Sequence, residues 1–252
     1  MNSQARKKAI IKGPGRYRLE FPGGLRVIEY KSQTFFQMSW AQYGQDVYLY
    51  HLLKERNNGF FVEAGAFDGE KFSNTLYLEI MRNWEGVLVE PNPYIFKDLV
   101  SKGRKSYMLN ACLGNDTKLE FLLGNWLTSA HKVLNDEHKD RIDSITLYNE
   151  ENYKSLRQKQ HDGENVTVFC YSLFEILNSV GRSHVDFFSL DVEGAELYIL
   201  QSLDWDKLTI DVFAVETYYN REKIMDFLIK KGYKWVHKIE LDDFFIRTDL
   251  IL

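Results

Sequence analysis

Several features that mark specialised proteins are scarce in this chain of 252 residues. It has two cysteines, Cys112 and Cys170, whose spacing fits neither a zinc site nor a disulfide framework, so we expect two reduced thiols. No apolar run approaches the roughly 20 residues that span a bilayer, and Ala9-Ile10-Ile11 is too short for the core of a signal peptide. The formal net charge is only −4, which excludes the strongly basic composition of many duplex nucleic-acid binders.

These absences set the expectations for compartment and partners. We expect a soluble chain, cytoplasmic by default, with no membrane span and no nucleic-acid partner. The sequence leaves open a secretory or membrane-anchored natural form, and it says nothing about oligomeric state. Two glycosylation sequons occur, Asn115-Asp116-Thr117 and Asn165-Val166-Thr167. A chain of this length contains about one or two by chance, so they do not establish a secretory route.

Apolar and aromatic side chains, by contrast, are plentiful. They make up 44% and 15% of the residues, enough for the core of one large α/β domain. Residues 1–40 differ from the rest, because glycine and proline punctuate short alternating pieces there. We interpret 1–40 as an N-terminal extension with a small hairpin, and 41–252 as the main domain. Within that domain, residues 124–165 are polar, with helical character between 136 and 160, and form an insert.

Buried strands and helices are expected to alternate along the main domain. Apolar runs predict five buried strands, at 60–63, 86–90, 106–113, 185–192 and 210–216. Two further segments, 233–239 and 244–247, flank a tight connection and predict an antiparallel pair. Alternation of strands with helices implies a mostly parallel sheet covered on both faces. We therefore predict an α/β, Rossmann-like fold with a C-terminal antiparallel hairpin.

The loop after the first buried strand is the strongest candidate for a cofactor site. Glycine-rich turns at this place let the backbone approach a ligand, and a helix N-terminus follows. A dinucleotide fingerprint needs three glycines in phase, and this loop has two. Its strand-end carboxylate would repel a pyrophosphate but suits the ammonium group of S-adenosylmethionine (SAM). We predict SAM as the cofactor, in contact with Glu63, Gly65, Ala66, Asp68 and Gly69.

The next two strands extend this predicted cofactor site. Glu90 ends the second strand, where an acid can accept hydrogen bonds from both ribose hydroxyls, and Pro91 follows it. NAD sites share that acid, so it favours SAM only in combination with Glu63 and the two glycines. The third strand ends near Ala111 and Cys112. Either residue borders the adenine ring, or both are ordinary packing residues.

Three acids follow the fourth and fifth strands, at the edge where open α/β sheets bind ligands. Asp191 and Glu193 lie at the carboxyl end of the fourth strand and point to one side of it, and Glu216 ends the fifth. We regard all three as candidate catalytic residues, and Asp191 also as a cofactor contact. One acid can serve as general base for an alcohol, if burial raises its pKa. Alternatively Asp191 and Glu216 hold Mg²⁺, or the acids only cap the following helix.

The chain also resembles a known family, the FkbM-type methyltransferases, and especially their animal Star-like relatives. The resemblance covers roughly residues 40 to 248. It is carried by five motifs: Gln42-Tyr43-Gly44-Gln45-Asp46, Phe61 to Gly69, Ser73-Asn74-Thr75, Leu88 to Pro93 and Leu190 to Glu196. The resemblance implies a Rossmann-like class I fold and O-methylation, with SAM, of a hydroxyl on a glycan, lipid or other small molecule. It also leaves open a catalytically inactive, Star-like binding or trafficking protein on the same fold.

The sequence leaves alternatives open for the roles of two further regions. Gln45 and Asp46 either cover the cofactor or cap the helix that follows them. The insert at 124–165 is expected to shape the pocket of a hydroxyl-bearing small-molecule or glycan acceptor. There Trp126, Tyr148 and Tyr153 either stack on a ring of the acceptor or pack inside the protein.

Overall fold

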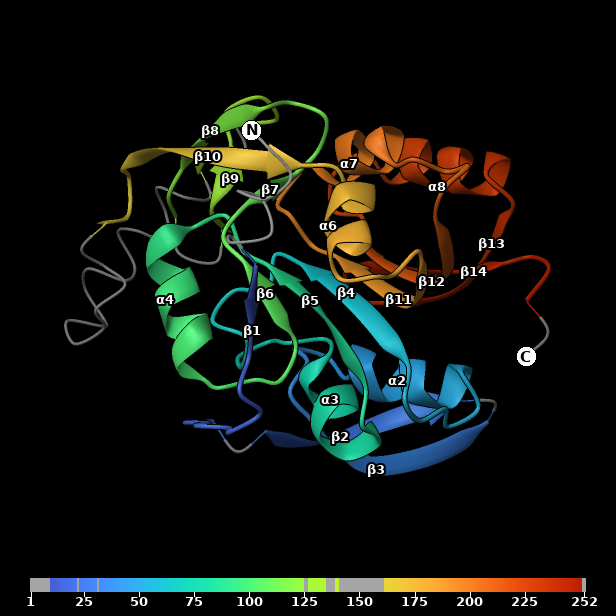
Figure 1. The fold of residues 1–252 in the computed structure, drawn as a ribbon. Helices are drawn as coiled ribbons and strands as arrows, with labels where there is room; N and C mark the ends of the chain where they lie inside the picture. The colour runs from blue at the N-terminus through green and yellow to red at the C-terminus, as the bar shows by residue number, and fades with distance from the viewer. Residues whose placement is uncertain are drawn as a thin grey trace.

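The computed structural model describes residues 10–21, 23–30, 32–124, 127–134, 139–140 and 161–250. Its centre is an eight-stranded mixed sheet in the order β1-β6-β5-β4-β11-β12-β14-β13 (Figure 1). The parallel part consists of β6 (Tyr107–Leu109), β5 (Glu85–Val89), β4 (Phe60–Ala64), β11 (His184–Leu190) and β12 (Thr209–Glu216). At one edge, β14 (Asp242–Arg247) pairs antiparallel with β12 and with β13 (Tyr233–Ile239). The predicted α/β fold with its C-terminal antiparallel hairpin is confirmed.

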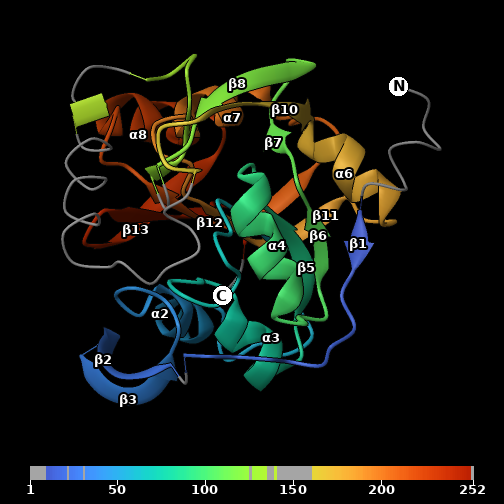
Figure 2. The same ribbon diagram turned by 90° about the vertical axis from the view of Figure 1, so that its left-hand side faces the viewer.

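Helices cover both faces of this sheet, as Figures 1 and 2 show from two sides. The apolar side chains of α6 (Leu173–Ser179), α7 (Glu196–Ser202) and α8 (Arg221–Lys230) belong to one core cluster. Those of α2 (Gln45–Leu52), α3 (Leu76–Arg82) and α4 (Pro93–Ser101) belong to the other. No helix in these described ranges is both long and apolar enough to cross a membrane.

Strand β4 shows how the alternation of side chains positions the later site. Phe60, Val62 and Ala64 pack into the cluster beneath α6, α7 and α8. Phe61 packs into the cluster beneath α2 and α3. Because successive side chains of a strand point to opposite faces, Glu63 points the same way as Phe61, toward the start of α3.

A second, smaller sheet stands beside the main one, with strand order β7-β10-β8-β9. Its strands are β7 (Cys112–Leu113), β10 (Asn165–Tyr171), β8 (Lys118–Leu122) and β9 (Ser129–Ala130). The single third strand expected at 106–113 is therefore wrong, because the chain leaves the main sheet after Leu109. The side-chain amide of Asn110 donates to the carbonyls of Glu90 and Pro91, at 2.8 and 2.9 Å, and holds this turn.

The two cysteines correct another expectation. Cys112 on β7 and Cys170 on β10 are direct partners in a parallel ladder, and they form a disulfide instead of two reduced thiols. They lie 58 positions apart in the sequence, so only the pairing of the strands brings them together. The disulfide ties the two strands at the side of the molecule where the cavity described below opens.

The N-terminal part contains the expected small hairpin, formed by β2 (Gly24–Tyr30) and β3 (Gln33–Ser39). Before it, β1 (Ile11–Lys12) pairs antiparallel with β6 at the edge of the main sheet. The buried carboxylate of Asp46 accepts bonds from Ser39 Oγ and from the backbone N–H of Trp40, at 2.6 and 3.0 Å. Asp46 thus fixes the chain between the hairpin and α2.

Candidate active site

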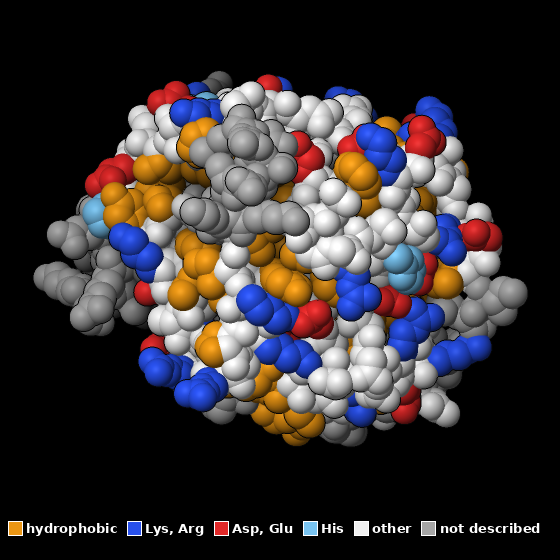
Figure 3. All heavy atoms as spheres, viewed as in Figure 1, with side chains coloured by type: hydrophobic (Ala, Val, Ile, Leu, Met, Phe, Trp, Pro, Cys, Tyr) orange, Lys and Arg blue, Asp and Glu red, His pale blue; other side chains and the backbone are white. Residues whose placement is uncertain are grey.

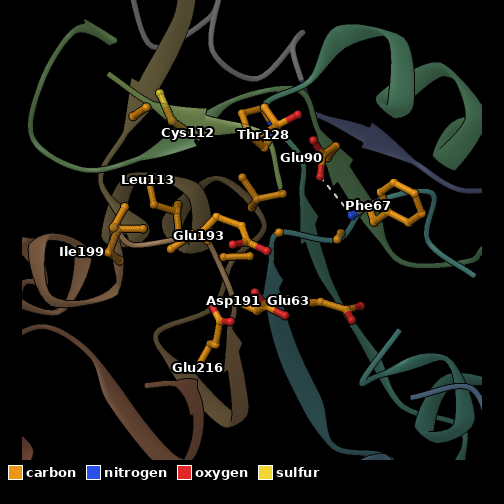
Figure 4. A pocket seen from close by; sticks show the side chains of 18 of the residues that line it. Glu63, Phe67, Glu90, Cys112, Leu113, Thr128, Asp191, Glu193, Ile199 and Glu216 are labelled. Atoms are coloured by element: carbon orange, nitrogen blue, oxygen red, sulfur yellow. Dashed lines mark hydrogen bonds between the residues drawn. The ribbon is translucent and has the colours of Figure 1, made fainter. Parts of the chain in front are cut away.

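A cavity of about 270 Å³ opens at the carboxyl ends of β4, β5, β11 and β12 (Figure 4). Nearly all the predicted site residues line it: Glu63, Gly65, Ala66, Glu90, Pro91, Ala111, Cys112, Asp191, Glu193 and Glu216. Asp68 and Gly69 do not; they shape the loop behind the wall. The fold therefore gathers most of the predicted residues around one cavity, and the role of each residue depends on the local geometry.

Glu63 is buried and already has partners in the protein. Its Oε2 accepts hydrogen bonds from Ser73 Oγ and Thr75 Oγ1 at 3.0 and 2.6 Å, and its Oε1 accepts from Asn74 N at 2.7 Å. In Figure 4 its carboxylate points away from the acids at the end of β11 and β12. Burial raises the pKa of Glu63, while the charge of Arg104 opposes that rise. Glu63 occupies the place before α3 where a dinucleotide would put its phosphate.

Arg104 organises the same loop from behind, and sequence analysis missed it. Its fully buried guanidinium donates to the Gly69 carbonyl at 2.9 Å and to Ser73 Oγ and Thr75 Oγ1 at 3.0 Å each. It also bonds Glu79 Oε2 at 3.2 Å. A buried charge needs such partners. No local pattern around position 104 announces the role, because all these partners are distant in sequence.

The glycines of the loop are required by packing within the protein. Gly65 has a φ of 80°, and a Cβ there would lie 1.7 Å from the backbone oxygen of Asp191. Gly69 has a φ of 74°, also in the region that favours glycine. Between them Asp68 Oδ1 accepts from Glu70 N and Lys71 N, at 2.9 and 2.8 Å. The two glycines therefore let β4 and the loop after β11 touch, and bend the chain around the cavity.

Glu90 lies on the cavity wall at the end of β5. Its Oε2 accepts from Phe67 N at 2.9 Å and its Oε1 from Asn92 N at 2.8 Å. Burial raises the pKa of Glu90 to about 8, although the two hydrogen bonds work against that rise. Each oxygen keeps a second lone pair, so Glu90 can still accept bonds from the hydroxyls of a ligand.

The opposite end of the cavity is apolar. It is lined by Ala111, Cys112, Leu113, Leu119, Phe121, Leu127 and Val133. The disulfide and β8 hold this wall together. None of the histidines in the described segments lines the cavity. Trp126, Tyr148 and Tyr153, for which the sequence leaves open stacking on the acceptor or packing inside the protein, lie outside the described residues.

Three acids meet at the inner end. Asp191, Glu193 and Glu216 each offer a carboxylate oxygen within 4.8 Å of the others (Figure 4). Burial, followed by the negative charges of Glu216, Asp242 and other acids, raises the pKa of Asp191 well above its usual range. Carboxylates this close cannot all be ionised without a cation, so the cluster favours a bound positive charge or a shared proton.

The segment after β11 holds this cluster in an unusual conformation. Glu193 has a φ of 52°, in the left-handed region that is costly for a residue with a side chain. Its carbonyl accepts a bond from Ser129 Oγ at 2.8 Å. The turn before α7 is capped by Glu196, which accepts from Val192 N and Gly194 N, both at 3.1 Å. Glu196 therefore fixes the turn that leads into α7, whose N-cap residue, Ala195, has no side-chain capping bond.

Comparison with known proteins identifies a family and, among the solved structures, distant likenesses that include the following two. The model of the methyltransferase FkbM domain matches residues 63–235, which is 173 of the 252 residues. No curated protein matches the chain. Precorrin-6y C5,15-methyltransferase from Geobacter metallireducens GS-15 is 12% identical, with a TM-score of 0.37, over 83% of this chain and 90% of that one. Aeropyrum pernix fibrillarin in complex with natively bound S-adenosyl-L-methionine is 12% identical, with a TM-score of 0.41, over 94% and 86%.

The assignment rests on the family match, which covers more than half of the chain. The matched segment begins at Glu63 and includes Glu90, Asp191 and Glu216, and with them most of the cavity. This chain belongs to the family of FkbM methyltransferase domains.

Proposed function

We propose that this protein transfers a methyl group from SAM to a hydroxyl of a glycan, lipid or other small molecule. The observation that carries the proposal is the acid cluster of Asp191, Glu193 and Glu216 at the inner end of a cavity whose other end is apolar. The alternative resemblance, to an inactive Star-like binding or trafficking protein, predicts the same fold without turnover.

The residues present fit SAM in both shape and charge. The apolar wall around Ala111 and Cys112 suits the adenine ring, and Glu90 suits the ribose hydroxyls. SAM carries two positive groups, a sulfonium and an ammonium, and Asp191 with its neighbours supplies negative charge at that end. Because Glu63 already accepts three hydrogen bonds from residues 73–75 and lies beside Arg104, we propose that Asp191 takes the role of contacting the ammonium that the sequence suggested for Glu63.

Proton removal from the acceptor is the task left to the protein. When bound, SAM would supply an electrophilic methyl group, and the rest of the cofactor, S-adenosylhomocysteine, would be the neutral thioether leaving group. As the hydroxyl oxygen bonds to that carbon, its proton must pass to a base. Asp191 and Glu216 are the candidates, because both line the cavity with carboxylate oxygens within 4.8 Å of each other, and burial raises the pKa of Asp191. Glu193, with its strained backbone, would hold the acceptor or share the proton.

Mg²⁺ is a second way to use the same acids. A hard cation on Asp191 and Glu216 would relieve their repulsion and lower the pKa of a bound hydroxyl. The two mechanisms differ in one measurable respect. Turnover that stops in chelator and returns with Mg²⁺ supports the metal, whereas turnover that ignores chelator supports the carboxylate base.

The proposed function is tested first by binding and then by transfer. Calorimetry with SAM, S-adenosylhomocysteine and NAD should show binding of the first two and none of NAD. Incubation with methyl-labelled SAM and a library of hydroxyl compounds and glycans, followed by mass spectrometry, identifies the acceptor. We expect Asp191→Asn and Glu216→Gln to lower turnover at least about 100-fold. Absence of SAM binding would refute the proposal, and SAM binding without transfer to any acceptor would favour the binding or trafficking alternative.

A further inference from the structure

The charges on SAM raise a question that the acid cluster does not answer. Besides its two positive groups, SAM carries a carboxylate on the methionine part. The inner end of the cavity already holds Asp191, Glu193 and Glu216, which would repel another anion. If the proposed function is correct, on which this inference rests, the protein must supply a cation or donors for that carboxylate.

The usual anion site of this fold is already occupied by the protein itself. Donors at the start of α3 would ordinarily receive an anion next to a glycine-rich loop. Here Asn74 N donates to Glu63, and the backbone N–H groups of Thr75 and Leu76 point to Ser73 Oγ, at 3.3 and 3.1 Å. The cofactor carboxylate therefore has to find its partner elsewhere on the wall.

Two lysines line the cavity in the part of the chain that the structure describes, Lys71 and Lys132. Lys132 is engaged already, since its ammonium lies 2.6 Å from Asp116 Oδ2 and above the ring of Tyr198. It also belongs to the segment after β9, by the apolar end. For Lys71 no carboxylate of the described residues lies within ion-pair distance. Its charge acts on Asp68 only at longer range, where it helps to lower a pKa that burial raises.

The backbone holds Lys71 in a defined place. Its N–H donates to Asp68 Oδ1 at 2.8 Å. The preceding Glu70 is fully buried, with its carboxylate 2.6 Å from Lys102 Nζ. The following Phe72 has a φ of 61° and bridges to Ala41. Both neighbours of Lys71 are thus anchored, and Lys71 lines the cavity from this anchored loop.

We propose that Lys71 binds the carboxylate of the cofactor's methionine part, and that this contact orients SAM with its positive groups toward Asp191. Gln42 and Asn74 also line the cavity. Their side-chain amides donate to Tyr43 Oη and Ser189 Oγ, and each amide has a second N–H that can donate to a ligand. In this arrangement the acid cluster contacts the sulfonium and the ammonium of SAM, and Lys71 contacts its carboxylate. Lys71 is a cofactor-binding residue that the glycine pattern did not reveal.

The test compares SAM with decarboxylated SAM, which lacks only the carboxylate in question. Binding of both is measured by calorimetry to the wild-type chain, Lys71→Met and Lys71→Arg. Lys97→Met is the matched control, because Lys97 is exposed on α4, lies outside the cavity and carries the same charge. Thermal unfolding of each variant verifies the fold.

We expect the wild type to prefer SAM over decarboxylated SAM by about 10- to 100-fold, the range for a hydrogen bond between charged groups. Lys71→Met should bind both ligands about equally, Lys71→Arg should keep part of the preference, and Lys97→Met all of it. If Lys71→Met still prefers SAM over decarboxylated SAM as the wild type does, this inference is overturned and the proposed function is not. The same conclusion holds if that variant keeps the preference and raises the KM for the acceptor. No binding of SAM by the wild type would overturn the proposed function itself.

Discussion

Glu63 Oε1 lies 2.7 Å from the backbone nitrogen of Asn74, so the strand-end acid of this protein binds the start of the following helix and not a ligand phosphate. The Glu63 carboxylate therefore excludes a pyrophosphate in two ways: it repels the negative charge, and it already accepts the backbone N–H that a phosphate would use. The same arrangement makes Glu63 a residue of the cavity wall that is held in place by the segment before α3.

We expect Glu63→Gln to destabilise the protein by about 1–3 kcal/mol, because the new amide would present donors to Ser73, Thr75 and Arg104, which are donors themselves. Chemical denaturation measures the change. Glu85→Gln is the control, since its ion pair with Lys12 is partly exposed and such pairs contribute about 0–1 kcal/mol. Equal small effects of the two variants would contradict the buried role of Glu63.

Gly65→Ala should cost more stability than Gly163→Ala. Both glycines have a positive φ, 80° and 84°, so both substitutions carry the backbone penalty of about 1 kcal/mol. Only at Gly65 would the added Cβ meet another backbone, the oxygen of Asp191 at 1.7 Å; at Gly163 nothing lies within 4 Å. We expect a loss of more than about 3 kcal/mol for Gly65→Ala in urea unfolding. Similar losses for both would show that the contact can relax easily.

Cofactor affinity should rise with pH up to about pH 8. The pKa of Glu90 is raised to about 8, chiefly by burial, so below that pH the free protein holds this carboxyl protonated. Hydrogen bonds from ribose hydroxyls favour the ionised form, and binding must then release a proton. The affinity for S-adenosylhomocysteine should therefore increase by up to tenfold per pH unit and level off above pH 8.

Glu90→Gln tests this assignment, because it cannot ionise and should flatten most of the pH profile. Asp191→Asn in the same background removes the contribution of Asp191, another cavity acid whose pKa is raised by burial. The folded chain without ligand should show the opposite trend. Since the folded-state pKa of Glu90 exceeds the unfolded value, its contribution to stability is present at low pH and is lost as pH rises through about 8. A pH-independent affinity in the wild type would contradict this role for Glu90.

Reduction of the disulfide should weaken both the fold and cofactor binding. In the chain-entropy description, a bond that closes a loop of 58 residues contributes about 4 kcal/mol. Cys112 also lines the apolar wall, so loosening β7 should lower the affinity for S-adenosylhomocysteine. Unfolding is followed with and without a phosphine reductant. The Cys112→Ala/Cys170→Ala double variant should start at the reduced level and ignore the reductant.

The order of strands and helices was predictable because each element has its own period in the sequence. The strand expected at 60–63 is found at Phe60–Ala64, and the terminal pair expected at 233–239 and 244–247 is found at Tyr233–Ile239 and Asp242–Arg247. These elements are long, apolar and bounded by turn residues, so local pattern and tertiary structure agree.

The features that the sequence analysis predicted wrongly or missed have one cause in common: each depends on contacts with residues that are distant in the sequence. The strand predicted at 106–113 is divided because Asn110 bonds the carbonyls of Glu90 and Pro91. The disulfide depends on a pairing between β7 and β10, and Arg104 binds partners within residues 69–79, at least 25 positions away in the sequence. The acids at the strand ends were found because the carboxyl edge of a parallel sheet is a geometric consequence of the element order.

The link between Gln45 and Asp242 has a consequence for work with fragments. Gln45 Nε2 donates to Asp242 Oδ2 at 2.7 Å, and so joins the beginning of the main domain to its final hairpin. Gln42 and Leu241, beside these two residues, both line the cavity, yet both lie outside the segment 63–235 that defines the family. A fragment cut to residues 63–235 would lose Gln42 and Leu241 from the cavity wall. The smallest unit able to enclose a ligand is therefore larger than the family signature, and truncation boundaries belong before residue 39 and after residue 247.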